Sequence, residues 1–402
     1  MHRTAFALSP RIPAVAAFVV MLAIGAWAQS ERVIYSFTGG SDGGSPYGGV
    51  ISDASGNLYG TTFQGGANSG GTVFKLTSNS GGTWTETVLY SFSYGTDGAL
   101  PSSGLVFDAK GNIYGLTLFS GIGQGAIFEI SPGANGIWTE KVLYTFMGGS
   151  DGYVPFAASL ALDSSGNLYG IATGGGIYGF GTIFELVAGS NGTWTKQVLH
   201  NFSGGNDGAF PYGEALTLDA AGNVYGTTLN GGLYDYGVVF ELVRGLNGNW
   251  TEKVLHAFTG VPDGSASTGA LVFDASGNLY GNSSYAVFQL TPGSNGTWTG
   301  KALHRFAGGR DGAYPASGLT FDKAGKLYGT TGAGGAHRGT VFELTPGANG
   351  TWTEEILHRF TSGGDGVFPG FAGLAMGANG HLYGTTPQGG ASNNGAVFEV
   401  IP

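Results

Sequence analysis

The sequence contains no cysteine, and only 10% of its 402 residues are charged. Without cysteine the chain forms no disulfide and carries no lipid on a cysteine after a cleavage site. Basic residues are also scarce, with 16 Lys and Arg against 26 Asp and Glu. This acidic balance argues against nucleic acid or an anionic membrane as a partner.

Long apolar runs are equally scarce, and the one that stands out lies near the N-terminus, over residues 14–24. Arg3 and Arg11 precede it, and Ala26-Trp27-Ala28 follows it as a small-x-small site. This pattern predicts a secretory signal peptide over residues 1–28, cleaved after Ala28. The run is short for a membrane span, although an uncleaved anchor is the alternative. We therefore expect a secreted or periplasmic protein with no membrane span after cleavage.

Glycine is abundant, at 79 residues, and it recurs at fixed places in a repeat of roughly 55 residues. Each repeat contains an Asp-Gly pair, a segment like D-A-S-G-N-L-Y-G-T, a V-F-E-L segment and a W-T-E-K-V-L segment. The Asp-Gly aspartates are Asp42, Asp97, Asp151, Asp207, Asp263, Asp311 and Asp365. A fixed period of this size, made of short apolar segments between turn residues, indicates a propeller or a solenoid.

One unit read in detail gives four antiparallel strands. In the second unit we expect strands over residues 104–108, 113–117, 126–130 and 138–146, separated by Gly- and Asn-rich turns. Period-two alternation places five residues of the last strand on one face, namely Trp138, Glu140, Val142, Tyr144 and Phe146. The longer connection over residues 147–154 carries the Asp-Gly pair and leads to the next unit. Four such strands make a propeller blade.

The two ends of the chain carry complementary parts of one unit. Seven first strands are present but only six tryptophan-bearing fourth strands, and Arg32–Phe37 matches the second half of the missing one. We therefore predict an all-β fold, a seven-bladed β-propeller of four-stranded antiparallel blades, whose N-terminal strand completes the C-terminal blade. Residues 29–402 would form a single domain. A parallel β-helix is the alternative, but it does not explain the partial units.

The unit from Ile34 to Thr77 reads I-Y-S-F-T-G-G-S-D-G, then G-N-L-Y-G-T-T and G-T-V-F-K-L-T. It resembles the bacterial GloVer (gloeo/verruco) repeat, over essentially all of residues 32–402. The resemblance implies a secreted tandem array and brings no catalytic residues to transfer. The G-N-L-Y strand is also similar, more loosely, to NHL-type propeller repeats.

Residues present in every unit are expected to be scaffold, because one active site needs its groups only once. We expect the Asp-Gly aspartates to accept backbone hydrogen bonds, rather than to bind calcium, since no D-x-D-x-D pattern is present. His200, His256, His304 and His358 replace tyrosine in other units, so we expect packing or hydrogen-bonding roles. The third-strand acids, such as Glu185, alternate with Lys75 and Gln289, which indicates surface positions. No metal site and no cofactor are predicted.

Residues that differ between units are the candidates for binding. On the second-to-third-strand loops and crossovers, which share one face, the ligand-binding candidates are Phe63, Phe119, Tyr178, Phe180, Tyr234, Tyr236 and Arg338. Further aromatic residues there include Phe156 and Phe371. The fifth unit has a shortened loop, Gly281–Tyr285, which we expect to leave a notch. Aromatic rings with polar neighbours suit sugars.

Glu214, Asp235 and His337 are the only non-repeated ionisable trio on this face that suggests catalysis, with two carboxylates for acid and base. The interpretation we favour is a binding or scaffold module whose ligand is a carbohydrate or a cell-surface polymer, with a protein partner left open. A glycan-active hydrolase or lyase using the trio is one alternative. A structural envelope protein without a specific ligand is another.

Overall fold

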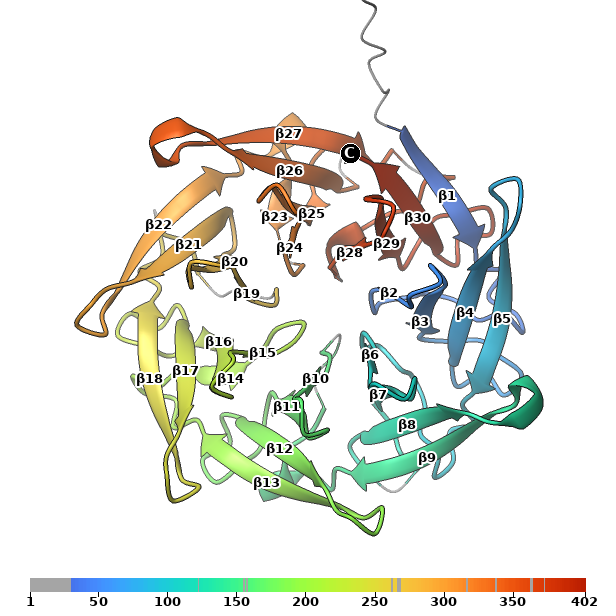
Figure 1. Cartoon of the computed structure of the whole chain (residues 1–402), viewed down its shortest axis with the longest axis horizontal. Coiled ribbons are helices and arrows are strands. Elements are labelled where there is room, and N and C mark those ends of the chain that lie inside the picture. Colours follow the sequence, from blue (N-terminus) through green and yellow to red (C-terminus); the bar gives the residue numbers. More distant parts are fainter. Residues whose placement is uncertain are drawn as a thin grey trace, which may run out of the picture.

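The computed structural model of the chain describes residues 30–402 except 122, 155, 157, 262, 266–268, 316, 337, 362–363 and 372. The predicted signal peptide and His337 therefore lie outside the described residues. Seven antiparallel sheets surround a central axis (Figure 1). The predicted seven-bladed propeller is confirmed. Across the described part of the chain, no helix combines the length and apolar character needed to cross a membrane.

Each blade has four strands, which lie at increasing distance from the axis. The innermost strands are β2 (Ile51–Ser52), β6 (Val106–Phe107), β10 (Ala161–Leu162), β15 (Thr217–Leu218), β19 (Val272–Phe273), β24 (Thr320–Phe321) and β28 (Ala375–Met376). The second strands are β3 (Leu58–Thr62), β7 (Ile113–Thr117), β11 (Leu168–Ala172), β16 (Val224–Asn230), β20 (Leu279–Asn282), β25 (Leu327–Ala333) and β29 (Leu382–Thr386).

The outer half of each blade is a longer hairpin. The third strands are β4 (Thr72–Ser78), β8 (Ala126–Pro132), β12 (Thr182–Ala188), β17 (Val238–Arg244), β21 (Ala286–Pro292), β26 (Thr340–Pro346) and β30 (Ala396–Ile401). The fourth strands are β5 (Trp84–Ser91), β9 (Trp138–Thr145), β13 (Trp194–Asn201), β18 (Trp250–Ala257), β22 (Trp298–Arg305), β27 (Trp352–Arg359) and β1 (Ser30–Ser36). Two further strands, β14 (Ala209–Pro211) and β23 (Ala313–Pro315), add to the second strands of their blades.

Blades 1 to 6 follow the chain, and each takes its four strands from one stretch of sequence: β2–β5, β6–β9, β10–β13, β15–β18, β19–β22 and β24–β27. Blade 7 has the order β28, β29, β30, β1, so its outermost strand comes from the N-terminus. β1 pairs antiparallel with β30, with Glu31 opposite Val400 and Ser36 opposite Ala396. Figure 1 shows these two strands side by side. The predicted closure of the ring is confirmed.

Pairs of buried phenylalanines join neighbouring blades. In blade 1, Phe74 of the V-F-K-L segment is fully buried, and the phenylalanine that ends the preceding unit, Phe37, meets it edge to face. Gly60 of L-Y-G must be glycine, because a Cβ there would lie 2.6 Å from the Phe74 ring. Burying two such rings at each junction contributes to blade packing.

A β-bulge in every fourth strand changes the alternation that the sequence predicts. In β9, Val142 and Tyr144 pair with consecutive residues of β8, so Leu143 is an extra residue. Consecutive residues face opposite sides of a sheet, and the bulge therefore turns Val142 and Tyr144 to opposite sides. Trp138 packs against the preceding blade, whereas Phe146 packs against the following one. The expectation that these residues share one face is wrong.

Four of the five third-strand acids are buried and the fifth, Glu129, is half-buried, so the expectation of surface positions is also wrong. Glu185 is only 2% exposed, because it lies opposite Tyr169 of the neighbouring strand and accepts a hydrogen bond from its hydroxyl. The tyrosine hydroxyl satisfies the buried carboxylate. Where lysine occurs instead, Lys75 lies over the Tyr59 ring, 5.5 Å from its centroid. The tyrosine on the neighbouring strand therefore accommodates either a negatively or a positively charged third-strand side chain.

Candidate functional site

The crossovers and the second-to-third-strand loops form one face of the ring, called here the crossover face. Pairing between the two kinds of segment shows this directly, because Gly44 bridges to Gln64 and Ala99 to Phe119. In blades 4 and 6 the same contact becomes regular pairing of β14 with β16 and of β23 with β25. The first-to-second-strand and third-to-fourth-strand turns lie on the opposite face.

Each crossover is held by its Asp-Gly aspartate, as the sequence predicts. Asp42 accepts hydrogen bonds from the backbone amide of Thr38 and from the hydroxyl of Tyr35. All seven aspartates bind the amide four residues earlier. The four histidines at the tyrosine position contact the aspartate and pack against a phenylalanine, for example His256 with Asp263 and Phe258. These groups are scaffold for the face.

Exposed aromatic side chains gather on the crossover face. The eight exposed Tyr and Phe residues of the described chain all lie there, and they are Tyr94, Phe119, Tyr153, Tyr178, Tyr234, Tyr236, Tyr314 and Phe371. The first six belong to the crossovers and loops of blades 2, 3 and 4. Phe119, Tyr178, Tyr234 and Tyr236 are sequence-predicted candidates. These exposed rings make the crossover face the candidate ligand-binding surface.

Two of the predicted aromatics are packed rather than free. Phe180 rests against Phe210, with ring centroids 5.5 Å apart, and covers Gly204 of the next crossover. Phe63 contacts Tyr47 and Phe156. Arg338 is half-buried with its guanidinium over the Phe368 ring, 5.9 Å from the centroid. These side chains support the face rather than projecting from it.

Phe63 belongs to an aromatic cluster that joins three blades near the central channel. Tyr47 lies at its centre, with centroid distances of 5.3 Å to Phe63, 4.7 Å to Phe156 and 5.4 Å to Phe371. Tyr47 and Phe371 both stand four residues before an innermost strand, and Phe156 stands five before one. Phe156 comes from blade 3, whereas Phe371 leads into blade 7. Tyr47 is not among the residues predicted from the sequence, although its place shortly before an innermost strand is a signal that could have identified it.

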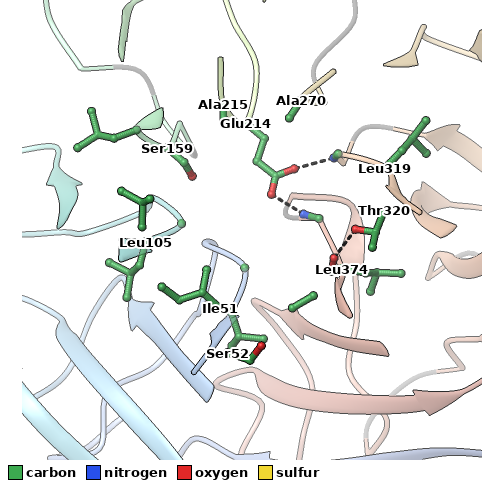
Figure 2. Close-up of a pocket in the computed structure, with 18 residues that line it drawn as sticks. Ile51, Ser52, Leu105, Ser159, Glu214, Ala215, Ala270, Leu319, Thr320 and Leu374 are labelled. Carbon is green, nitrogen blue, oxygen red and sulfur yellow. Dashed lines mark hydrogen bonds between the residues drawn. The ribbon is translucent and has the colours of Figure 1, made fainter. Parts of the chain in front are cut away.

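Beneath the aromatic cluster, the central channel forms a cavity of about 380 Å³, lined mostly by glycine, alanine and aliphatic side chains of the innermost strands. Glu214 enters it from blade 4 (Figure 2). Its carboxylate accepts hydrogen bonds from the amides of Gly318, at 2.6 Å, and Gly373, at 2.7 Å. These amides belong to blades 6 and 7, so the side chain spans the channel. Burial raises the pKa of Glu214, and the two amide hydrogen bonds act in the opposite direction.

The predicted trio is not brought together by any contact among the described residues. Asp235 is exposed, has a φ of +60°, and uses its carboxylate to accept a hydrogen bond from the amide of Gly231 in its own loop. The residues that line the cavity around Glu214 do not include Asp235. With His337 outside the described residues, a catalytic role for the trio stays a prediction.

A second, larger cavity of about 1160 Å³ opens on the opposite face, between blades 6, 7 and 1. Its charged groups include Asp322, Lys323, Lys326 and His381. Lys326 pairs with Glu343, and His381 with Glu399, each at 2.7 Å.

The shortened loop of blade 5 is a tight turn in which the Ser283 amide donates to the Ala286 carbonyl.

Comparison with solved structures supports the architecture. Virginiamycin B lyase from Staphylococcus aureus, crystallised as a catalytically inactive variant with quinupristin, is 14% identical with a TM-score of 0.56, over 93% of this chain and 99% of the other. A protein from Lactobacillus plantarum is 16% identical with a TM-score of 0.57, over 82% and 88% of the two chains. At these identities the similarity shows the fold alone.

Proteins with curated descriptions yield no match to this sequence. The family model described as the Gloeobacter/Verrucomicrobia repeat matches three overlapping stretches, residues 25–194, 123–286 and 285–402. Together these stretches include every blade of the ring, and the resemblance predicted from the repeat unit is confirmed. The chain belongs to the Gloeobacter/Verrucomicrobia repeat family.

Proposed function

We propose that the protein is a binding module whose crossover face takes an extended carbohydrate or cell-surface polymer across blades 2 to 4. The observation that carries this proposal is the position of the exposed aromatics. All eight in the described chain lie on one face, and six of them belong to three consecutive blades. A row of separate rings suits a polymer with a repeating apolar surface better than it suits one compact small molecule.

The geometry of single rings supports stacking. Tyr236 is 45% exposed, yet it covers Gly260 of the next crossover, where a Cβ would come within 3.0 Å of the ring. The glycine lets the ring rest on the backbone, which holds one side of it while leaving surface for a ligand. Polar side chains that are exposed nearby, Gln124, Asn206 and Asp235, offer hydrogen bonds to hydroxyl groups.

The two alternatives receive less support. An acid–base role for Glu214 requires a free carboxylate oxygen, but both of its oxygens accept backbone hydrogen bonds. A structural envelope protein without a ligand has no need of exposed aromatics grouped on one face. The similarity to the lyases shows only the propeller fold, so we do not extend their chemistry to this chain.

A glycan and polysaccharide array tests the proposal. We expect the purified protein to bind one polymer class, and Tyr234→Ala/Tyr236→Ala to weaken that binding at least tenfold, since losing one stacked ring costs about 1 kcal/mol. Ile137→Ala/Leu246→Ala removes exposed apolar side chains from the turns of the opposite face and serves as the matched control. A folded wild-type protein that leaves the array blank, or a tyrosine variant that binds normally, would contradict the proposal.

Action outside the cytoplasm is part of the same proposal. It is supported by the predicted signal peptide over residues 1–28, with cleavage after Ala28. Mass spectrometry of the protein recovered from the periplasm or the medium should find Gln29 at its N-terminus. Recovery of an intact N-terminus in the membrane fraction would favour the uncleaved anchor.

A further inference from the structure

The seven junctions between blades are built from the same three positions, and the residues at these positions differ from one junction to another. At each junction the Asp-Gly aspartate of the crossover meets a Tyr or His from the fourth strand of the preceding blade. A third residue comes from the fourth strand of the following blade. The β-bulge makes this arrangement possible, because it turns the two halves of each fourth strand toward opposite neighbours.

The third residue is always the partner of the same third-strand position, such as Leu76 opposite Glu86. In ring order the sets are Tyr35–Asp42–Glu86, Tyr90–Asp97–Glu140, Tyr144–Asp151–Lys196, His200–Asp207–Glu252, His256–Asp263–Gly300, His304–Asp311–Glu354 and His358–Asp365–Glu31. Five junctions therefore place a glutamate beside the aspartate. Two carboxylates in a half-buried place repel each other.

The junction between blades 2 and 3 differs from these five, because its third residue is positively charged. Lys196 replaces the glutamate, and its ammonium lies 2.7 Å from the Asp151 carboxylate. Its side chain is only 5% exposed, and the ammonium also lies over the Phe146 ring, 4.7 Å from the centroid. The fold thus holds a buried positive charge at one junction, whereas the equivalent position at five others carries a second negative charge.

At three junctions the set consists of a histidine, an aspartate and a glutamate; we call these the His–Asp–Glu junctions. Among the described residues, the donor atoms of all three members lie within 4.8 Å of one another at one of these junctions, that of His304, Asp311 and Glu354. His304 Nε2 is 3.1 Å from Asp311 Oδ1. Arg359 is close enough to lower the pKa of Glu354, but its Nε donates to the Arg310 carbonyl. The three side chains are in place to share one ion.

At the junction of blades 6 and 7, three buried polar atoms have no hydrogen-bond partner. They are His358 Nε2, Asp365 Oδ1 and Glu31 Oε1. His358 Nε2 lies 3.4 Å from Asp365 Oδ2 but makes no hydrogen bond with it. The Glu31 side chain is only 10% exposed, and its other oxygen lies 3.9 Å from His358 Nε2. At the junction of blades 3 and 4, His200 Nε2 and Glu252 Oε1 are buried without a hydrogen bond in the same way, with His200 Nε2 3.4 Å from Asp207 Oδ2. Glu86 Oε1 and Glu140 Oε1 at two tyrosine junctions also lack a partner, so the imidazole is what distinguishes the His–Asp–Glu junctions. Such atoms are costly unless something binds them.

We propose that the three His–Asp–Glu junctions bind divalent cations, with Zn²⁺ the ion that the donor set fits best. One imidazole nitrogen and two carboxylates are ligands that Zn²⁺ accepts, at about 2.0–2.2 Å, with water completing a tetrahedron. Each ion joins a fourth strand, its crossover and the fourth strand of the next blade. The ion held by Glu31 also fastens the N-terminal strand that closes the ring.

The test is calorimetric titration of chelator-treated protein with Zn²⁺, with bound metal counted by elemental analysis. We expect about three ions per chain. His304→Tyr and His358→Tyr should each remove about one ion without unfolding the chain, since tyrosine fills this place at three other junctions. Glu354→Gln should also remove one.

Matched controls come from the junctions that lack histidine. Glu86→Gln and Glu140→Gln change the same position beside a tyrosine and should leave the number of bound Zn²⁺ ions unchanged. Absence of Zn²⁺ binding by the folded protein would overturn the proposal. So would a Zn²⁺ count that His304→Tyr and His358→Tyr leave unaltered, or binding of Ca²⁺ alone, because calcium does not require the imidazole.

Discussion

Phe37 and Phe74 meet edge to face with their ring centroids 5.1 Å apart, and this contact joins the last blade to the first. Phe37 directly follows the N-terminal strand, whereas Phe74 lies in the first complete blade. An equivalent pair occurs inside the ring, where Phe202 meets Phe240 at 5.3 Å. Both Phe37 and Phe202 are fully buried. The junction made by the two chain ends is therefore built like a junction within continuous sequence.

Phe37→Ala should destabilise the protein as much as Phe202→Ala does. Each substitution removes a buried ring from a blade junction, which costs about 3–5 kcal/mol. Denaturant unfolding of both variants measures the two losses. If the N-terminal strand were only loosely attached, Phe37→Ala would cost much less than its counterpart. Deletion of residues 30–37, which removes the strand itself, should lower the Tm further than either substitution.

Lys196 gives a prediction about charge at the junctions. Replacing it with glutamate creates a carboxylate pair with Asp151 in place of a buried ion pair, and we expect a loss of about 3–5 kcal/mol in metal-free protein. Lys196→Met, which keeps the aliphatic volume, should cost less than the glutamate variant. Lys141→Glu is the control, because that lysine is exposed and its ammonium donates to the Gly192 carbonyl rather than to a carboxylate. Equal losses for the two glutamate variants would contradict the argument.

The same carboxylates predict how stability depends on pH. Five fourth-strand glutamates have a pKa raised to about 7 by burial and by the crossover aspartates: Glu31, Glu86, Glu140, Glu252 and Glu354. A raised pKa means that the folded state binds more protons than the unfolded state. The free energy of unfolding should therefore fall as pH rises from about 4.5 to about 7.

A second group of carboxylates acts in the opposite direction at lower pH. Hydrogen bonds lower the pKa of Asp53, Asp108 and Asp274 against the opposing effect of burial. Their contribution is lost as pH falls through those lowered values, so metal-free protein should be most stable at mildly acidic pH. Urea unfolding at about pH 5 and about pH 8, with a chelator present, shows which pH gives the larger free energy of unfolding. In Glu86→Gln/Glu140→Gln the difference should shrink; a wild type that is more stable at the higher pH would refute the prediction.

The sequence predicts the ring because its repeat shows every strand directly, and the partial units at the ends show the closure. It also predicts the role of the Asp-Gly aspartates, since a group present seven times is scaffold. It does not predict the burial of Glu185, because lysine and glutamine at the same position suggest tolerance, whereas a tyrosine across the strand pair accommodates all three. The bulge at Leu143 is likewise invisible, as it changes pairing without changing the apolar pattern.

The junction sets depend on contacts that no single repeat contains. His304 lies in β22 and Asp311 in the crossover that follows it, but Glu354 belongs to the next blade, and Glu31 meets His358 only because the ring closes. The aromatic candidates were found from their variation between units, but variation does not distinguish the exposed Tyr236 from the packed Phe180. That distinction depends on the loop conformations.

The contact between Glu214 and Gly318 across the channel can be measured with a double-mutant cycle. Glu214→Ala removes a carboxylate that accepts two backbone hydrogen bonds, and we expect a loss of about 1–3 kcal/mol. Gly318→Ala should also destabilise, because its Cβ would lie 2.7 Å from Glu214 Oε2. Once the glutamate is alanine, that Cβ no longer meets the carboxylate. In the double variant the glycine substitution should therefore cost at least about 1 kcal/mol less than it does alone. Denaturant unfolding of the four proteins gives the coupling, and additive losses would mean that Glu214 does not span the channel in solution.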